Sequence, residues 1–133
     1  MAEQTNSPLE WRLLAERDLS VAEHLAATMR PLPTEVVAFF CQQTAEKYLK
    51  GALVILGVEP PRAFLDELCA LPEKKRPAFA SVSTQCSVIS HFSVQPRYDL
   101  GLSLSEDDMK TVIAHAKSIR DFLKAETPEL FAE

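Results

Sequence analysis

The ten residues at positions 42–51 constrain the fold of this chain more than any other stretch. They read QQTAEKYLKG and lie between the apolar segments 36–40 and 52–56. Because helical side chains repeat every 3.6 residues, the polar members fall within about 60 degrees of one another on a helix; these are Gln43, Glu46, Lys47 and Lys50. The opposite side is apolar, with Ala38, Cys41, Ala45, Leu49, Ala52 and Leu56. The pattern predicts one helix that buries an apolar face and presents charged and amide groups on the other.

The remaining sequence has the same helical character. Ser7-Pro8-Leu9-Glu10 is a capping box with proline at the first helical position. Thr34 is a candidate cap for the second helix, and Gly57 a candidate stop. No alternating strand pattern is found. Apolar spacing and these signals predict helices over about 8–29, 34–56, 62–71, 79–89 and 105–124. We expect an all-α fold, an antiparallel four- to five-helix up-and-down bundle.

Length and spacing predict a single domain. At 133 residues the chain suffices for one hydrophobic core. Residues 1–7 are expected to form a disordered tail, 8–125 the bundle and 126–133 a C-terminal tail. Between helices, we expect a charged turn at 72–77 and an ordered loop at 91–104.

Composition excludes several classes of function. No apolar run reaches the roughly 18–20 residues that span a bilayer, and no signal peptide is evident, so we expect a cytoplasmic protein without membrane contact. A net charge of −5 argues against a broad nucleic-acid-binding surface. The three cysteines lack metal-site spacing and are interpreted as buried thiols. No metal or cofactor is predicted, since glycine-rich phosphate loops are also missing.

Asp18 interrupts the apolar stripe of the first helix, which consists of Trp11, Leu14, Ala15, Ala22, Leu25 and Met29. A carboxylate on a core-facing stripe needs a cationic or N–H partner. Lys47, Lys50 or Arg97 are candidates for that partner. Asp18 and its cationic partner are interpreted either as a structural ion pair between the first two helices or as a shared site at a groove or dimer interface.

Arg97-Tyr98 follows Pro96 in the predicted late loop, where functional groups are often presented. The guanidinium suits phosphate or carboxylate, and tyrosine can stack on a base. The alternative is a loop anchor in which Arg97 pairs with Asp18 or Glu46. For acid–base catalysis the pattern is poor, because His24, His91 and His115 lie in different segments without an activating motif.

Three segments of the chain together resemble the HEPN domain family; they are 15–22 (AERDLSVA), 40–51 (FCQQTAEKYLKG) and 92–98 (FSVQPRY). The resemblance implies an antiparallel helical bundle that usually dimerises. Many members are encoded beside, or fused to, a minimal nucleotidyltransferase, often as toxin–antitoxin pairs. It further implies nucleotide binding, or metal-independent ribonuclease activity in members that carry an arginine followed by four to six residues and a histidine late in the fold.

The chain departs from the ribonuclease pattern. Neither Arg97 nor Arg120 is followed by a histidine at that spacing. The literal match, Arg17 to His24, lies in the first predicted helix, away from the late part of the fold. The family's His-Asp or His-Ser step at the third helix is also replaced, by Ala63-Phe64-Leu65-Asp66.

We therefore interpret the chain as a homodimeric binding module with no assigned catalytic residue. Its expected partners are a minimal nucleotidyltransferase and a nucleotide or RNA, in a system of the toxin–antitoxin type. The alternatives are a metal-independent toxin ribonuclease with a degenerate or unidentified active site, and a purely structural partner subunit. The predicted polar site consists of Asp18, Gln43, Glu46, Lys47, Lys50, Arg97 and Tyr98.

Overall fold

The computed structural model describes residues 6–94 and 104–132, with the side chains of 93 and 94 left out. This part of the chain is helical and contains no strand, which confirms the predicted fold class. The α-helices are α1 (Pro8–Thr28), α2 (Thr34–Ile55), α3 (Leu65–Lys75), α4 (Ser83–Val94) and α5 (Glu106–Glu126). Two 3₁₀ segments, η1 (Pro77–Val82) and η3 (Pro128–Phe131), precede α4 and follow α5.

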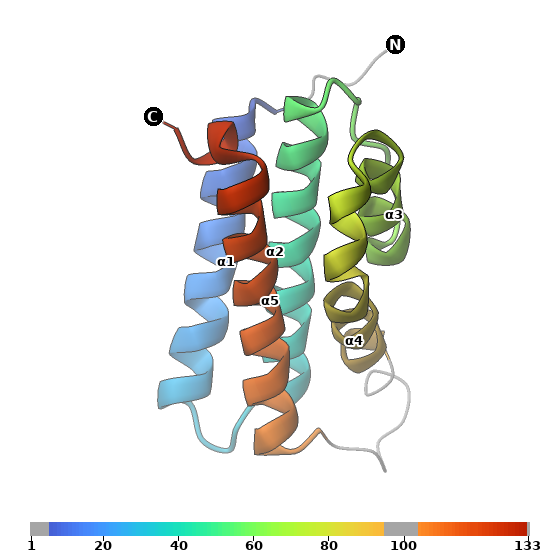
Figure 1. The fold of residues 1–133 in the computed structure, drawn as a ribbon. Helices are drawn as coiled ribbons and strands as arrows, with labels where there is room; N and C mark the ends of the chain where they lie inside the picture. The colour runs from blue at the N-terminus through green and yellow to red at the C-terminus, as the bar shows by residue number, and fades with distance from the viewer. Residues whose placement is uncertain (1–5, 95–103, 133) are drawn as a thin grey trace.

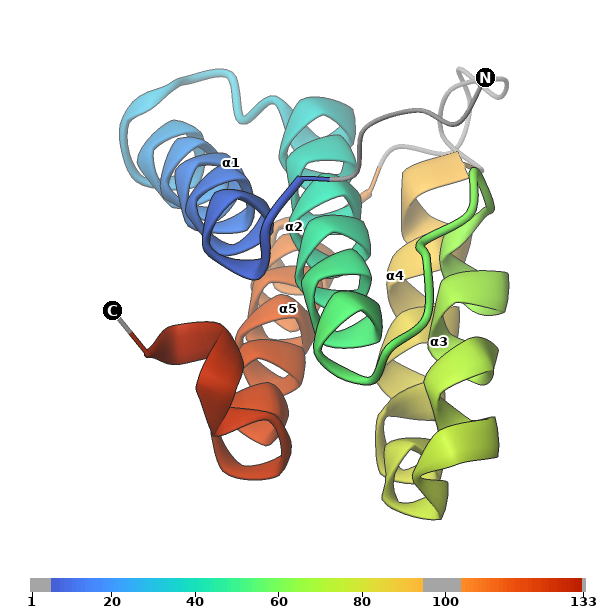
Figure 2. The same ribbon diagram turned by 90° about the horizontal axis from the view of Figure 1, so that it is seen from above.

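Helix α2 lies at the centre of the bundle and packs against every other α-helix (Figures 1 and 2). Helices α1 and α4 run in one direction, and α2 and α5 run in the other (Figure 1). Helices α1 and α5 lie on one side of α2, whereas α3 and α4 lie on the other (Figure 2). The described helices therefore form a helical bundle in which α1, α2, α4 and α5 alternate in direction, whereas α3 runs in the same direction as α2 after the segment 57–64 has returned along the bundle (Figure 2).

Local signals set the ends of the long helices. Ser7 Oγ accepts from the Glu10 backbone N–H at 3.2 Å, while Glu10 Oε1 accepts from the Ser7 N–H at 2.8 Å, so the predicted capping box is present. Helix α2 ends at Ile55, Gly57 follows its cap with a φ of 80°, and the Val58 N–H donates to Leu53 O at 2.9 Å. Thr34 is not the cap of α2: Pro33 holds that position without a side-chain hydrogen bond.

Helix α3 extends beyond its predicted end. The expected charged turn at 72–77 is wrong for its first four residues, because 72–75 still belong to α3. Leu65, Leu68 and Pro72 are all buried, so the apolar stripe continues through the proline. Lys74 and Lys75 lie in the last turn, where positive charge is favourable to the helix dipole.

Three further segments differ from the expectation. Residues 91–94 were expected in a loop but complete α4, whereas 95–103 lie outside the described residues. The expected C-terminal tail, 126–133, includes η3, whose Leu130 is fully buried. Met29 is 49% exposed, so it does not belong to the buried stripe of α1. No helix in the described part of the chain has the length and apolar character needed to cross a membrane.

Small residues let α1 and α2 approach closely. Ala15 and Ala22 of α1 are fully buried, and Thr44 Oγ of α2 donates to the Ala15 carbonyl at 3.3 Å. At Gly51 a Cβ atom would lie 2.7 Å from Leu130 Cδ1 and 3.1 Å from Trp11 Cβ. Glycine at this position therefore allows α1, α2 and η3 to meet.

We predict that Gly51→Val lowers the free energy of unfolding by about 1–3 kcal/mol, because the new side chain overpacks this contact. Chemical denaturation followed by circular dichroism measures the change. Ser20→Val is the matched control, since Ser20 is an exposed position of α1 and a change below about 0.5 kcal/mol is expected there. Equal losses in the two variants would contradict the proposed role of Gly51.

Candidate functional site

The α1–α2 contact contains a buried ion pair centred on Asp18. The Asp18 side chain is 2% exposed, and Lys47 Nζ donates to its Oδ2 from α2. Arg17 donates to Oδ1 from Nε at 3.2 Å and from Nη2 at 3.1 Å. Both carboxylate oxygens therefore have a cationic donor, as a buried carboxylate requires. Of the three predicted partners, Lys47 is the one that the described residues place on Asp18.

A second polar group lies on α2 beside this pair. Gln42 Nε2 donates to Glu46 Oε1 at 3.0 Å, and Gln43 Nε2 lies 3.4 Å from Glu46 Oε2. All three side chains are half-buried. The Glu46 carboxylate is thus held by two amides of its own helix, and its orientation is fixed without a cation.

Lys50 contacts a third group. Its Nζ lies 5.2 Å from the centre of the Trp11 ring, in a cation–π contact between α2 and α1. The Trp11 indole N–H is buried and has no hydrogen-bond acceptor among the described residues. The predicted polar band of α2 is therefore divided into three neighbouring groups, each with its own contacts within α1 and α2.

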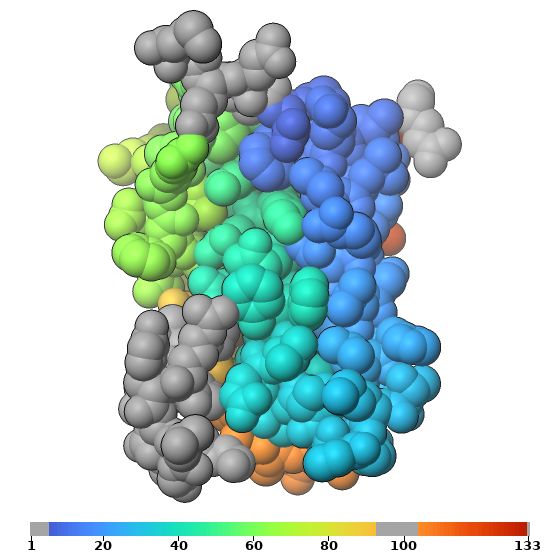
Figure 3. Space-filling model, turned by 180° about the vertical axis from the view of Figure 1, so that it is seen from behind, coloured from blue at the N-terminus to red at the C-terminus, as the bar shows by residue number. Residues whose placement is uncertain are grey.

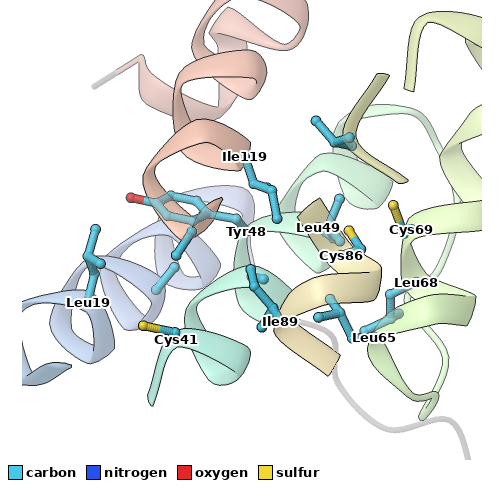
Figure 4. Close-up of a cluster of buried hydrophobic side chains, with 14 of the residues drawn as sticks. Leu19, Cys41, Tyr48, Leu49, Leu65, Leu68, Cys69, Cys86, Ile89 and Ile119 are labelled. Carbon is cyan, nitrogen blue, oxygen red and sulfur yellow. The ribbon is translucent and has the colours of Figure 1, made fainter. Parts of the chain in front are cut away.

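The sequence interpretation missed Tyr48, which lies inside the same ten residues. Its side chain is fully buried, and its hydroxyl has no hydrogen-bond partner in the described part of the chain. Figure 4 shows the hydroxyl directed between α1 and α5. Burial raises the pKa of Tyr48 to about 12; the nearby Glu16 carboxylate adds to the rise, whereas Arg120 and Arg12 oppose it. Tyr48 is therefore a neutral phenol at physiological pH.

Arg17 and Gln42 were also missed. Arg17 was considered only as the first residue of an Arg–His match, yet its guanidinium is bonded to Asp18. Its position next to the buried carboxylate was the signal in the sequence. Arg97 and Tyr98 lie outside the described residues, so their place in the site stays a prediction from the sequence.

The other reactive side chains do not join this site. His24, His91 and His115 lie on α1, α4 and α5. Burial raises the pKa of Cys41 to about 12, so this thiol stays protonated. Within residues 6–94 and 104–132, no three side chains of histidine, cysteine, aspartate or glutamate are grouped to hold a metal ion.

Comparison with known proteins identifies the family. The sequence model of the HEPN domain family matches residues 9–126, which is nearly the whole chain. This protein belongs to the HEPN domain family. No curated protein sequence matches the chain.

A solved structure has the same fold. The crystal structure of an archaeal HEPN homologue superposes with a TM-score of 0.71 at 24% sequence identity. The match covers 91% of this chain and 98% of that one. At this identity the similarity shows the fold of the HEPN domain and carries no residue roles.

The ion pair of this HEPN domain predicts an asymmetric response to substitution. Asp18→Ala leaves Lys47, whose side chain is 18% exposed, without its counter-charge, and should cost about 3 kcal/mol of unfolding free energy. Lys47→Met should cost less, because Arg17 still donates to Asp18. The double variant should recover part of the loss of Asp18→Ala.

The surface pair between Glu23 and Lys117 provides the control. Its atoms are 2.9 Å apart, but both side chains are about two-fifths exposed. Glu23→Ala should therefore change the free energy of unfolding by less than about 1 kcal/mol. Urea denaturation of the five proteins measures these values, and additive losses in the double variant would contradict a coupled pair.

Proposed function

We propose that this HEPN domain is a binding module that recognises protein partners through one strip of α2. The strip consists of five residues at helical spacing on the outer side of α2, which are Val36, Phe39, Gln43, Glu46 and Lys50. Arg17 of α1 completes it. Figure 3 views the molecule from the side on which α1 and α2 lie next to each other. The partners are a second copy of the chain and a minimal nucleotidyltransferase.

The observation that carries the proposal is that the polar groups of this surface are already paired and fixed. Glu46 is held by Gln42 and Gln43, and Lys50 by Trp11. A surface whose side chains are fixed before binding loses less conformational entropy in a complex. It presents a defined pattern of donors and charges to a complementary surface.

Apolar exposure at one end of the strip supports a protein partner. Val36 is 42% exposed in the first turn of α2, and Phe39 is half-buried one turn later. Protein interfaces combine such apolar contacts with a polar rim. The cations nearest the buried carboxylate, Lys47 and Arg17, are engaged by Asp18 and are less available to a phosphate.

We predict that Val36→Asp weakens self-association about ten-fold or more, because it places a charge in the centre of an apolar contact. The fold should be unaffected, since aspartate is favourable in the first turn of a helix. Light scattering after size exclusion, over a dilution series, measures the monomer–dimer equilibrium.

Phe64→Asp is the matched control, because Phe64 is an apolar side chain that is 76% exposed at the start of α3 and does not belong to the strip. It should leave the equilibrium unchanged. A monomeric wild-type protein that also fails to bind a minimal nucleotidyltransferase would contradict the proposal.

Nucleotide binding is proposed to depend on Arg97 and Tyr98, with the arginine and a lysine holding phosphate and the tyrosine stacking on the base. Arg97→Ala should then weaken ATP binding about ten-fold, the effect of one charge-assisted hydrogen bond, without lowering the free energy of unfolding. Isothermal titration measures the affinity. Lys74→Ala, at an exposed position of α3, should bind as the wild type does.

The ribonuclease alternative has a direct test. The protein is incubated with a structured RNA in the presence of a chelator, and the products are separated by electrophoresis. Binding without cleavage, or no binding, agrees with the proposed module. Cleavage that is lost in Arg97→Ala would replace it with an enzyme.

A further inference from the structure

A cavity of about 410 Å³ lies between α3 and the η1–α4 segment, on the side of the molecule away from α1. Most of its lining residues are exposed, so the cavity opens to solvent. Its buried wall consists of Phe79 and two thiols, Cys69 of α3 and Cys86 of α4. Nothing in the proposed function uses this cavity.

The two thiols contact each other across the α3–α4 interface. Cys69 and Cys86 share a side-chain hydrogen bond, and Figure 4 shows their sulfur atoms on neighbouring helices. They are 5% and 1% exposed, so only small molecules in the cavity can reach them. Both are free thiols.

The hydrogen bond makes the two thiols chemically different. The Cys69 sulfur accepts a hydrogen bond from the Cys86 S–H, which lowers the pKa of Cys69. Burial and the carboxylates of Asp66 and Glu73 act in the opposite direction. The same bond, with burial, raises the pKa of Cys86. Cys69 is therefore the thiol that ionises more readily and is assigned as the nucleophile, and Cys86 is the proton donor beside it.

The backbone of α3 lacks one helical hydrogen bond next to the pair. Pro72 lies inside α3 and has no N–H, so the Leu68 carbonyl receives no helical hydrogen bond from it. This missing bond lies in the turn that carries Cys69. A shift of the Cys69 side chain toward Cys86 therefore moves a helical turn that is held by one backbone hydrogen bond fewer.

We propose that Cys69 and Cys86 form an oxidisable thiol pair, and that the cavity admits hydroperoxides to it. The Cys69 thiolate attacks one peroxide oxygen, the O–O bond breaks, and hydroxide leaves with the electron pair to give a sulfenic acid at Cys69. Cys86 then attacks the Cys69 sulfur and the sulfenic oxygen leaves as water, which takes up the Cys86 proton. Overall, two thiols and one hydrogen peroxide give one disulfide and two water molecules.

Cys41 is the internal control for this chemistry. It is fully buried in α2, its pKa is raised to about 12, and it does not line the cavity. Burial among apolar neighbours makes a thiol inert. Oxidation of the native protein should therefore spare it.

The test uses the reduced full chain and stoichiometric hydrogen peroxide, with intact-mass and peptide-mapping analysis. Wild type and Cys41→Ser should each lose about 2 Da, the two hydrogens of a disulfide, with residues 69 and 86 in one cross-linked peptide. Cys86→Ser should instead accumulate a sulfenic acid at Cys69, which dimedone traps. Cys69→Ser should react at least about ten-fold more slowly, because Cys86 stays protonated.

Each opposite outcome would overturn the inference. A disulfide that contains Cys41, or one that forms between two chains, would show that the cavity does not select the pair. Equal reaction rates for Cys69→Ser and Cys86→Ser would show that the two thiols have no distinct roles. Circular dichroism of each variant before oxidation confirms that the bundle is folded.

Discussion

The contact between α1 and α2 is the constraint on which the rest of the structure depends. Small residues bring the two backbones together, and the Asp18 carboxylate is thereby taken out of water next to Lys47. The other carboxylate oxygen accepts from Arg17, so both oxygens of Asp18 have a cationic donor from α1 or α2. Its position fixes the rotation of α2, and α2 in turn supplies the surface against which every other α-helix packs.

Much of this arrangement was predictable from sequence because α2 alternates a core face and a polar face with unbroken helical periodicity. The same reasoning named Lys47 as one of three candidate partners of Asp18, with Lys50 and Arg97, since a carboxylate on an apolar stripe needs a cation. It failed at Pro72, where a breaker residue lies inside α3 because its ring belongs to the buried stripe. It also missed Tyr48: a tyrosine on a buried face looks like ordinary core, and periodicity does not report whether its hydroxyl finds a partner.

The division of the polar band changes how the site of this HEPN domain is understood. Viewed along a helix, Gln43, Glu46, Lys47 and Lys50 form one cluster. In the folded chain Gln43 contacts Glu46, while Lys47 pairs with Asp18 and Lys50 lies over Trp11, so the four side chains do not converge on a common point. Chemistry on a bound substrate needs convergent groups, whereas recognition of an extended surface needs groups held side by side. This distinction favours a binding role for the strip.

The hydroxyl of Tyr48, which has no hydrogen-bond partner among the residues that the structure describes, has an evolutionary consequence. A buried hydroxyl without a partner costs on the order of 1–3 kcal/mol relative to a phenylalanine of the same shape. Folding alone therefore favours loss of that oxygen, and a single nucleotide change from tyrosine to phenylalanine would remove it. Among related chains, phenylalanine at this position would mark lineages selected for stability alone, and retained tyrosine those in which the oxygen between α1 and α5 contributes something besides packing.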